Sequence, residues 1–215
     1  MKLLDLFCGA GGAAMGYYRA GFTDITGIDI EPMPRYPFKF IRADALEYLA
    51  EHGREYDVIH ASPPCQRYSI TKNLKTITKT YPDLIDKIRI VLLEIGRPYV
   101  IENVVGAPLL NPLMLCGSMF GLGVIRHRLF ESAPPIWFSP ASCRHGRVLP
   151  MWWAARKKFL KQGRQHQFIC VAGDSFLVTE GRKAMGIEWM TRKELAQAIP
   201  PAYTEFIGRQ LEKRK

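Results

Sequence analysis

One cysteine in this chain stands where a nucleophile would be expected. Cys65 lies in the polar turn Ser62-Pro63-Pro64-Cys65-Gln66-Arg67-Tyr68-Ser69, directly after the apolar run 57–61. Because two prolines deny this turn helical geometry, the thiol should point in a fixed direction from the carboxyl edge of a sheet, where open α/β sheets bind ligands. A thiolate at that edge could act as a nucleophile. The alternative is a small buried residue, the common fate of free cysteine.

A glycine turn near the start of the chain could hold a nucleoside cofactor. The pattern Gly9-x-Gly11-x-x-Ala14 separates an apolar strand-like run from a helix-like one, and Asp29 ends the next strand-like run. Glycines let a cofactor approach the backbone, and an acid at the second strand end can accept hydrogen bonds from ribose hydroxyls. This pattern alone does not separate a nicotinamide cofactor from S-adenosylmethionine, and a tight turn without a ligand is the alternative.

Two further polar groups follow apolar runs. Glu102-Asn103-Val104 ends one such run, and Arg126-His127-Arg128 opens another. If these strand ends meet the other two, one crevice would hold a thiol, a carboxyl group and two guanidinium groups beside a nucleoside cofactor. The alternative for the arginines is a charged strand end that only caps carbonyl groups.

The elements that would position these residues alternate along the chain. Strands are predicted over 3–7, 25–29, 38–42, 57–61, 99–102 and 126–130, and helices over 13–20, 45–51 and 83–95. This alternation predicts an α/β fold with a doubly wound, mostly parallel sheet and a small inserted basic domain. The expected divisions are 1–131 (cofactor-binding and catalytic), 132–186 (basic target recognition) and 187–215 (returning helices, over 191–199 and from Pro200-Pro201).

The positive charge is concentrated in one segment. Of the formal net charge of +10, residues 140–193 supply most, with 11 Lys/Arg against 3 Asp/Glu, whereas residues 1–139 hold 15 against 14. Trp152, Trp153, Phe159 and Phe168 lie among these bases. Basic residues interleaved with aromatic ones suit a polyanion such as nucleic acid; a solvated basic face is the alternative.

The residue types in the chain also argue against a metalloprotein, a membrane protein and a secreted protein. The five cysteines show no C-x-x-C pair, and Cys143-x-His145 lacks two further ligands at usable spacing, so no metal site is predicted. No run approaches the roughly 18 apolar residues that cross a bilayer, and the first residues do not resemble a secretory signal. We expect a soluble, cytoplasmic monomer with no membrane association and no obligate protein partner.

Together these motifs resemble those of the DNA cytosine-C5 methyltransferases. The resemblance covers 1–131 and about 190–211, in the family's order. The matching stretches are Asp5-Leu6-Phe7-Cys8-Gly9-Ala10-Gly11-Gly12, Pro63-Pro64-Cys65-Gln66-Arg67-Tyr68-Ser69, Glu102-Asn103-Val104, Arg126-His127-Arg128 and Ala198-Ile199-Pro200-Pro201.

The resemblance implies a role for each matching position. Its catalytic residues would be Cys65, Glu102, Arg126 and Arg128. The residues that bind S-adenosylmethionine would be Asp5, Phe7, Gly9, Gly11, Gly12, Asp29, Ile30, Asp44, Ala45, Pro64 and Gln197. Those that contact duplex DNA would be Gln66, Arg67, Ser69, Lys72, Arg144, Arg156, Lys157 and Lys158.

The implied reaction is covalent. The Cys65 thiolate would attack C6 of a cytosine flipped out of the duplex, while Glu102 holds or protonates N3 and C5 takes the methyl group. Loss of the C5 proton and elimination of Cys65 would release 5-methylcytosine. Arg126 and Arg128 would lower the pKa of the thiol and grip the base or its phosphate.

Three departures from the family pattern accompany the resemblance. Val124 replaces a polar residue before the arginines, Ile30 replaces an aromatic residue after the ribose-binding acid, and Ala196-Gln197 replaces Gly-Asn. Three other functions stay open: the same chemistry on RNA, a catalytically silent DNA-binding relative, and a nicotinamide dehydrogenase. The dehydrogenase leaves the Pro-Cys-Gln turn and the Glu-Asn-Val stretch unexplained.

Overall fold

The structure of the protein is a computed structural model that describes residues 1–64, 84–136, 138–148, 161 and 168–213. Its strands are β1 (Lys2–Leu6), β2 (Asp24–Asp29), β3 (Lys39–Arg42), β4 (Val58–Ala61), β5 (Tyr99–Asn103), β6 (Leu113–Leu115) and β7 (Arg128–Ala133). Its helices are α1 (Gly12–Arg19), α2 (Ala45–His52), α3 (Ile85–Ile95), α5 (Val178–Met185), α6 (Arg192–Gln197) and α7 (Pro201–Glu212), with the 3-10 turns η1 (Gly53–Glu55) and η3 (Gly117–Phe120).

The strands form one sheet in the order β3-β2-β1-β4-β5-β7-β6. The first five run parallel, whereas β7 is antiparallel to both β5 and β6. Because β7 runs backwards, its first residue lies at the edge where the parallel strands end. The predicted doubly wound, mostly parallel α/β fold is confirmed.

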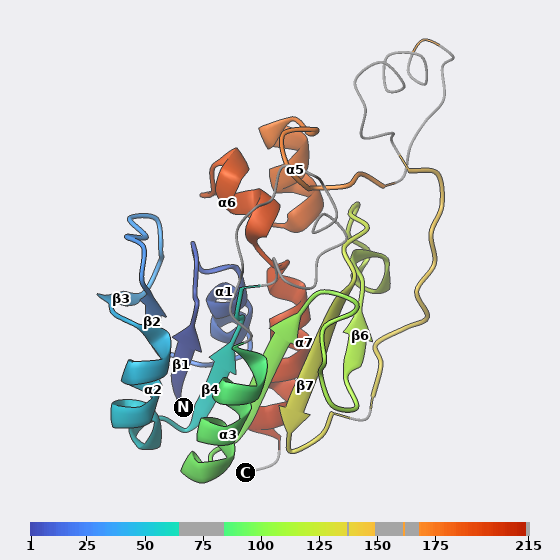
Figure 1. Ribbon diagram of the computed structural model, residues 1–215. Helices are drawn as coiled ribbons and strands as arrows, with labels where there is room; N and C mark the ends of the chain where they lie inside the picture. The colour runs from blue at the N-terminus through green and yellow to red at the C-terminus, as the bar shows by residue number, and fades with distance from the viewer. Residues whose placement is uncertain (65–83, 137, 149–160, 162–167, 214–215) are drawn as a thin grey trace.

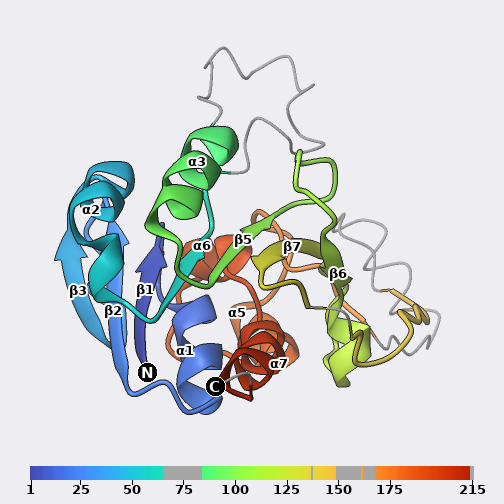
Figure 2. The same ribbon diagram turned by 90° about the horizontal axis from the view of Figure 1, so that it is seen from below.

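Helices cover both faces of the sheet. Figures 1 and 2 show α1 and α7 on one face and α2 and α3 on the other. The central strands are apolar on both faces, as buried parallel strands require. On β1, Leu3 joins the apolar cluster beneath α1 and α7, while Leu4 and Leu6 join the cluster beneath α2 and α3.

The last helix closes against the first. A Cβ on Gly16 of α1 would lie 2.0 Å from Thr204 Oγ1 on α7, so only glycine permits this approach. The Thr204 hydroxyl donates to Ala13 O at 2.8 Å. Pro201 begins α7, where a missing N–H costs nothing. The end of the chain therefore supports the glycine turn from which α1 starts.

A third apolar cluster lies above the sheet edge and includes Ala10, Val124, Val171, Met185 and Leu195. It joins α5, α6 and the segment 169–190 to the ends of the strands (Figure 1). Val124, one of the departures from the family pattern, is fully buried here and bridges Ile169. An apolar residue at that position is therefore explained by packing.

Most predicted bounds differ from the structure by one or two residues, with the largest difference at β7, and the strand β6 and the helix α5 were missed. The strand predicted over 126–130 runs over Arg128–Ala133, so the proposed division at 131 falls inside β7. The sequence did not indicate β6, which has three residues, or α5, whose interior Gly181 disfavours a helix. Gly181 is required because a Cβ there would lie 2.6 Å from the Phe176 ring. Within the described residues no helix is long and apolar enough to span a membrane.

Candidate active site

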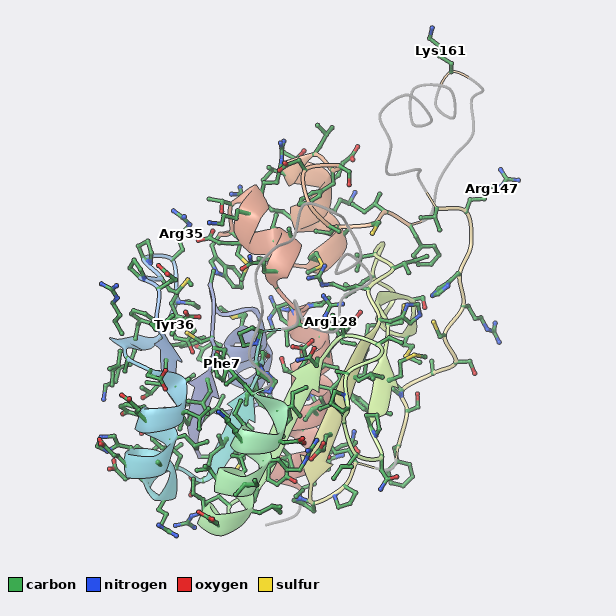
Figure 3. The ribbon with its side chains drawn as sticks, viewed as in Figure 1. Phe7, Arg35, Tyr36, Arg128, Arg147 and Lys161 are labelled. Carbon is green, nitrogen blue, oxygen red and sulfur yellow. The ribbon has the colours of Figure 1, made fainter. Side chains whose placement is uncertain are left out.

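A cleft of about 1090 Å³ lies at the carboxyl edge of the sheet. It is lined by the ends of β1, β2, β4 and β5, by the start of β7 and by the segment 191–199. In Figure 3, Phe7 and Tyr36 lie on one side of this edge and Arg128 on the other. Of the residues predicted to form the site, Asp5, Phe7, Gly9, Gly12, Asp29, Pro64, Glu102, Arg126, Arg128 and Gln197 line the cleft.

The glycine turn is built from unusual backbone conformations. Phe7 has a φ of 56°, rare for a bulky residue, and Gly11 has a φ of 82° as it caps the start of α1. Gly9 lines the cleft, and a Cβ there would meet no atom within 4 Å. A Cβ on Gly12 would lie 2.5 Å from Ile199 O. The turn thus leaves open space on the cleft side while packing tightly behind.

Asp29 is held by the backbone at the end of β2. Gly9 N–H donates to its Oδ2 at 3.0 Å, and Glu31 N–H donates to its Oδ1 at 3.1 Å. Each carboxylate oxygen has two lone pairs, so both retain a further acceptor site. An oriented carboxylate with spare acceptor sites in a cleft suits a pair of ribose hydroxyls.

Tyr36 is buried behind the cleft lining, and sequence reasoning missed it. Its hydroxyl donates to Asp5 Oδ2 at 3.0 Å, and its ring lies over Gly27, where a Cβ would be 2.3 Å away. Asp5 is fully buried, its Oδ1 has no hydrogen-bond partner among the described residues, and burial raises its pKa well above the usual range. The glycine in β2 was the only sequence signal for a ring packed there.

Four predicted cofactor residues do not line the cleft. Gly11 lies behind it, where a Cβ would be 2.6 Å from Pro37 Cδ. Ile30 is 62% exposed. Asp44 is the N-cap of α2 and accepts from the N–H groups of Leu46 and Glu47, and Ala45 is buried in the core. The cofactor roles of these four residues stay predictions.

The loop carrying the predicted nucleophile begins at the cleft. Cys65, Gln66, Arg67, Ser69 and Lys72 lie outside the described residues, but Pro64 lines the cleft. Asn103, at the end of β5, is buried, and its Nδ2 donates to Pro63 O at 3.0 Å. Its Oδ1 accepts from Val104 N–H at 2.9 Å. Asn103 therefore positions the proline turn that precedes Cys65, a role that the sequence did not reveal.

Glu102 and Arg128 form a buried ion pair at the opposite end of the cleft. Arg128 Nε lies 3.0 Å from Glu102 Oε1. Burial raises the pKa of Glu102, an effect that Arg128, a hydrogen bond from Ser62 and Arg126 partly offset. A carboxyl group whose pKa is raised gives up its proton less readily than an exposed one, and this direction of shift suits a general acid.

A chain of polar side chains leads from the core to Glu102. The His60 ring on β4 has Nδ1 3.1 Å from the Tyr17 hydroxyl and Nε2 2.9 Å from the Ser62 hydroxyl. Ser62 in turn bonds to Glu102. Burial lowers the pKa of His60 to about 3, so the ring is neutral at physiological pH. This chain fixes the Ser62 hydroxyl against the Glu102 carboxyl group.

Arg126 lines the cleft but also ties two segments together. Its Nη1 donates to Val171 O at 2.7 Å and its Nη2 to Ala196 O at 2.8 Å. The Tyr203 hydroxyl donates to Arg126 O at 2.6 Å. Arg126 Nε is buried without a partner among the described residues. Arg126 therefore caps carbonyl groups, as the alternative interpretation expected, while facing the cleft.

The predicted DNA-contacting bases are only partly described. Arg144 is exposed, whereas Arg156, Lys157 and Lys158 lie outside the described residues. Two neighbouring bases, Arg147 and Lys161, project well away from Phe7 and Arg128 in Figure 3. The described part of the basic segment thus extends beyond the cleft edge.

The side chains at the β1–β2 end suit a nucleoside cofactor, because they combine an aromatic ring, an oriented acid and a glycine turn with open space before it. Those at the β5–β7 end combine a carboxyl group of raised pKa with arginine. A cleft of this kind at the carboxyl edge of a parallel sheet is where open α/β folds bind their ligands.

The comparisons with known proteins identify the family. The C-5 cytosine-specific DNA methylase family model matches residues 1–108, half of the chain. This chain belongs to that family, which confirms the resemblance drawn from its motifs.

Curated relatives match about half of this chain. Type II methyltransferase M.FnuDI of Fusobacterium nucleatum is 34% identical over 113 residues, which are 49% of this chain and 33% of the relative. Type II methyltransferase M1.HphI of Haemophilus parahaemolyticus is 30% identical over 123 residues, 48% of this chain and 32% of the relative. The chain thus spans about a third of the length of these curated relatives.

A solved structure extends the fold comparison over the whole chain. The S. pombe Dnmt2 methyltransferase superposes with a TM-score of 0.63 at 15% identity, covering 100% of this chain and 99% of that one. The two proteins share the fold, including the second half of this chain, which the family model does not match.

Proposed function

We propose that this protein transfers a methyl group from S-adenosylmethionine to C5 of cytosine in duplex DNA. The observation that carries the proposal is the convergence, at one cleft, of the Asp29 and glycine-turn cradle with the proline turn before Cys65 and with the Glu102–Arg128 pair. Family membership supports the same chemistry. We further expect a cytoplasmic monomer that needs no obligate protein partner.

S-adenosylmethionine, when bound, would supply an electrophilic methyl group. Phe7 would lie against its adenine and Asp29 would accept hydrogen bonds from its ribose, because both line the β1–β2 end of the cleft. Gly9 and Gly12 would let the cofactor approach the turn closely. Asp5 is held behind the turn by Tyr36 and keeps one acceptor oxygen for a donor in the cleft.

The chain's own residues would act on the cytosine. The Cys65 thiolate would add to C6 and place electron density on C5, while Glu102 supplies a proton to N3. Arg128 would keep the Glu102 carboxyl group oriented at 3.0 Å. Once C5 carries the methyl group, a base such as water takes the C5 proton, the N3 proton returns to Glu102 and Cys65 leaves as a thiolate, which restores the aromatic ring. The base must leave the stack to reach these groups.

The direct test is product analysis. Purified protein is incubated with S-adenosylmethionine and mixed-sequence duplex DNA or, in a separate reaction, RNA; the nucleic acid is then digested and 5-methylcytosine nucleosides are quantified by mass spectrometry. We expect product on DNA from the wild type, none from Cys65→Ala, and wild-type amounts from Cys170→Ser, a matched cysteine outside the proposed machinery. Product on RNA alone would mean that the substrate is RNA and not DNA, and no product on either nucleic acid would overturn the proposed activity.

A further inference from the structure

Four side chains outside the cleft converge on one point. The thiols of Cys116 and Cys143 and the imidazoles of His127 and His145 each offer one ligand atom, and these atoms all lie within 4.8 Å of one another. We propose that this cluster, here called the Cys2His2 cluster, binds one structural Zn²⁺ ion. The proposal is independent of the methyl-transfer activity.

The distances within the cluster match a tetrahedral zinc site. Zn–S bonds of about 2.3 Å and Zn–N bonds of about 2.0–2.1 Å imply S···N edges of about 3.6 Å and an S···S edge of about 3.8 Å. Cys143 Sγ lies 3.4 Å from His127 Nε2 and 3.0 Å from His145 Nε2, and Cys116 Sγ lies 3.4 Å from His145 Nε2. Both imidazoles direct the same nitrogen at the sulfurs. Two sulfurs and two imidazole nitrogens are the donor set that favours zinc.

The surroundings of the sulfurs support metal ligation. Backbone hydrogen bonds from Ser118 and Arg126 reach Cys116, which is buried. The Ser118 hydroxyl lies 3.5 Å from Cys143 Sγ and accepts from Arg144 N–H at 3.2 Å. Such outer contacts orient the ligands of metal sites. With four protein ligands the site would be closed, so its role would be structural rather than catalytic.

This site could not be predicted from the sequence because its ligands are far apart along the chain. The prediction of no metal site depended on the lack of partners for Cys143 and His145. The fold supplies them, since Cys116 follows β6 and His127 precedes β7, and these two strands are neighbours. A gap of ten residues separates the first two ligands, and fifteen separate His127 from Cys143.

The position of the cluster indicates what the ion would hold together. His127 stands between Arg126 and Arg128, and Arg128 Nη1 donates to His127 O at 2.8 Å. Cys143 and His145 belong to the start of the basic segment, and Phe168 N–H donates to Arg147 O at 3.2 Å, which joins two parts of this segment. A bound Zn²⁺ would therefore fasten the base of the basic segment to the strand that carries the cleft arginines.

The test measures metal, not methyl transfer. The protein is purified without chelators from cells grown with zinc, and its metal content is determined by mass spectrometry. We expect one zinc ion per chain in the wild type and its loss in Cys143→Ser and His145→Ala. The matched controls Cys170→Ser and His52→Ala, which alter a cysteine and a histidine outside the cluster, should retain it. His145 is exposed, so its removal leaves no cavity that could unfold the protein.

A second measurement tests the geometry. The metal-free protein, prepared with a strong chelator, is titrated with Co²⁺, and the expected result is the visible absorption of a tetrahedral thiolate-ligated ion, saturating at one equivalent. Zn²⁺ should displace it and raise the Tm, whereas Mg²⁺ should do neither. The proposal would be overturned if the wild type purified without zinc and gave no such spectrum. It would also be overturned if the cluster variants kept the ion, or if freshly purified protein contained a Cys116–Cys143 disulfide.

Discussion

Two buried glutamate–arginine pairs flank the β5–β7 ladder, and only one of them faces the cleft. Glu131 on β7 accepts two hydrogen bonds of 2.8 Å from Arg89 on α3, one from Leu110 N–H and a longer one from the Tyr99 hydroxyl. Glu102 on β5, by contrast, has two partners among the described residues, Arg128 Nε at 3.0 Å and the Ser62 hydroxyl. The carboxylate of Glu131 is satisfied by the protein, whereas that of Glu102 keeps acceptor capacity toward the cleft.

This difference separates a structural pair from a functional one. A carboxylate has about four acceptor sites, and a buried one with all of them filled has nothing left to offer a ligand. A buried carboxylate with free acceptor sites has lost its hydration without regaining all of its hydrogen bonds, which is typical of functional sites. The same distinction can be tested by changing equivalent atoms in each pair.

The largest expected effect follows from Glu102→Gln. Because glutamine cannot deliver a proton to N3, kcat should fall by about 10²–10⁴-fold, while S-adenosylmethionine affinity, which depends on the β1–β2 end, stays unchanged. Single-turnover methylation with calorimetric measurement of cofactor binding tests this. An unchanged rate would show that Glu102 is structural, like Glu131.

Glu131→Gln should give the opposite pattern. Removing the charge leaves Arg89 with the exposed Asp86 as its remaining carboxylate partner and with one hydrogen bond to Pro108 O. Breaking a buried pair costs up to about 3–5 kcal/mol of stability, and Asp86 should keep the loss at or below the lower end of that range. Urea unfolding should therefore shift to lower midpoint, with methylation per folded molecule retained. If activity fell while stability held, the two pairs could not be distinguished by their hydrogen bonds.

Asp29, at the end of β2, and Asp44, just after β3, allow the same comparison between a functional and a structural acid, here for cofactor binding. Asp29→Asn should weaken S-adenosylmethionine binding by about 10- to 100-fold, the effect of losing charge-assisted hydrogen bonds of about 1.5–3 kcal/mol. Asp44→Ala should instead cost about 1 kcal/mol of stability, because Asp44 caps α2. Calorimetry on both variants decides between them, and a comparable loss of cofactor affinity in Asp44→Ala would restore the cofactor role that the family resemblance implied.

These pairs also show what the sequence could and could not predict. The glycine turn, Asp29 and Glu102 were predictable because each follows a strand whose apolar run is readable, and parallel strands end at one edge. Tyr36 and Asn103 were missed because their roles depend on contacts with Asp5 and Pro63, which only the folded sheet brings near. The Cys2His2 cluster was missed for the same reason.

The strand β6 and the helix α5 were not predicted for a different physical reason. β6 has three residues and α5 contains Gly181, so neither carries a hydrophobic period long enough to read. Tertiary packing against Phe176 and β7 determines both elements. The antiparallel direction of β7, which places Arg128 at the cleft, is equally a property of the sheet rather than of the local residues.

The smallest expected effect concerns the polar chain behind Glu102. Burial lowers the pKa of His60 to about 3, whereas histidine in an unfolded chain titrates near pH 6.5. Between these values the unfolded state binds the additional proton, so the stability contributed by neutral His60 is lost as the pH falls below about 6.5, by up to about 1.4 kcal/mol per pH unit. Gln in place of His60 removes this component, so the free energy of unfolding of His60→Gln should depend less on pH.

Urea unfolding at several pH values from 7 down to 5 measures this dependence. The comparison variant His52→Gln changes a half-buried histidine on α2 whose Nδ1 lies 2.8 Å from Glu55 Oε1, and it should alter the slope less than His60→Gln does. Equal slopes for His60→Gln and the wild type would mean that His60 is not held neutral by the fold, and the chain from Tyr17 through Ser62 would then not fix the Glu102 carboxyl group as the distances indicate. If His60→Gln instead shows a reduced pH slope together with slower methylation, the hydrogen bonds from Tyr17 through Ser62 support the Glu102–Arg128 pair at the cleft. They would then have no part in the Glu131–Arg89 pair.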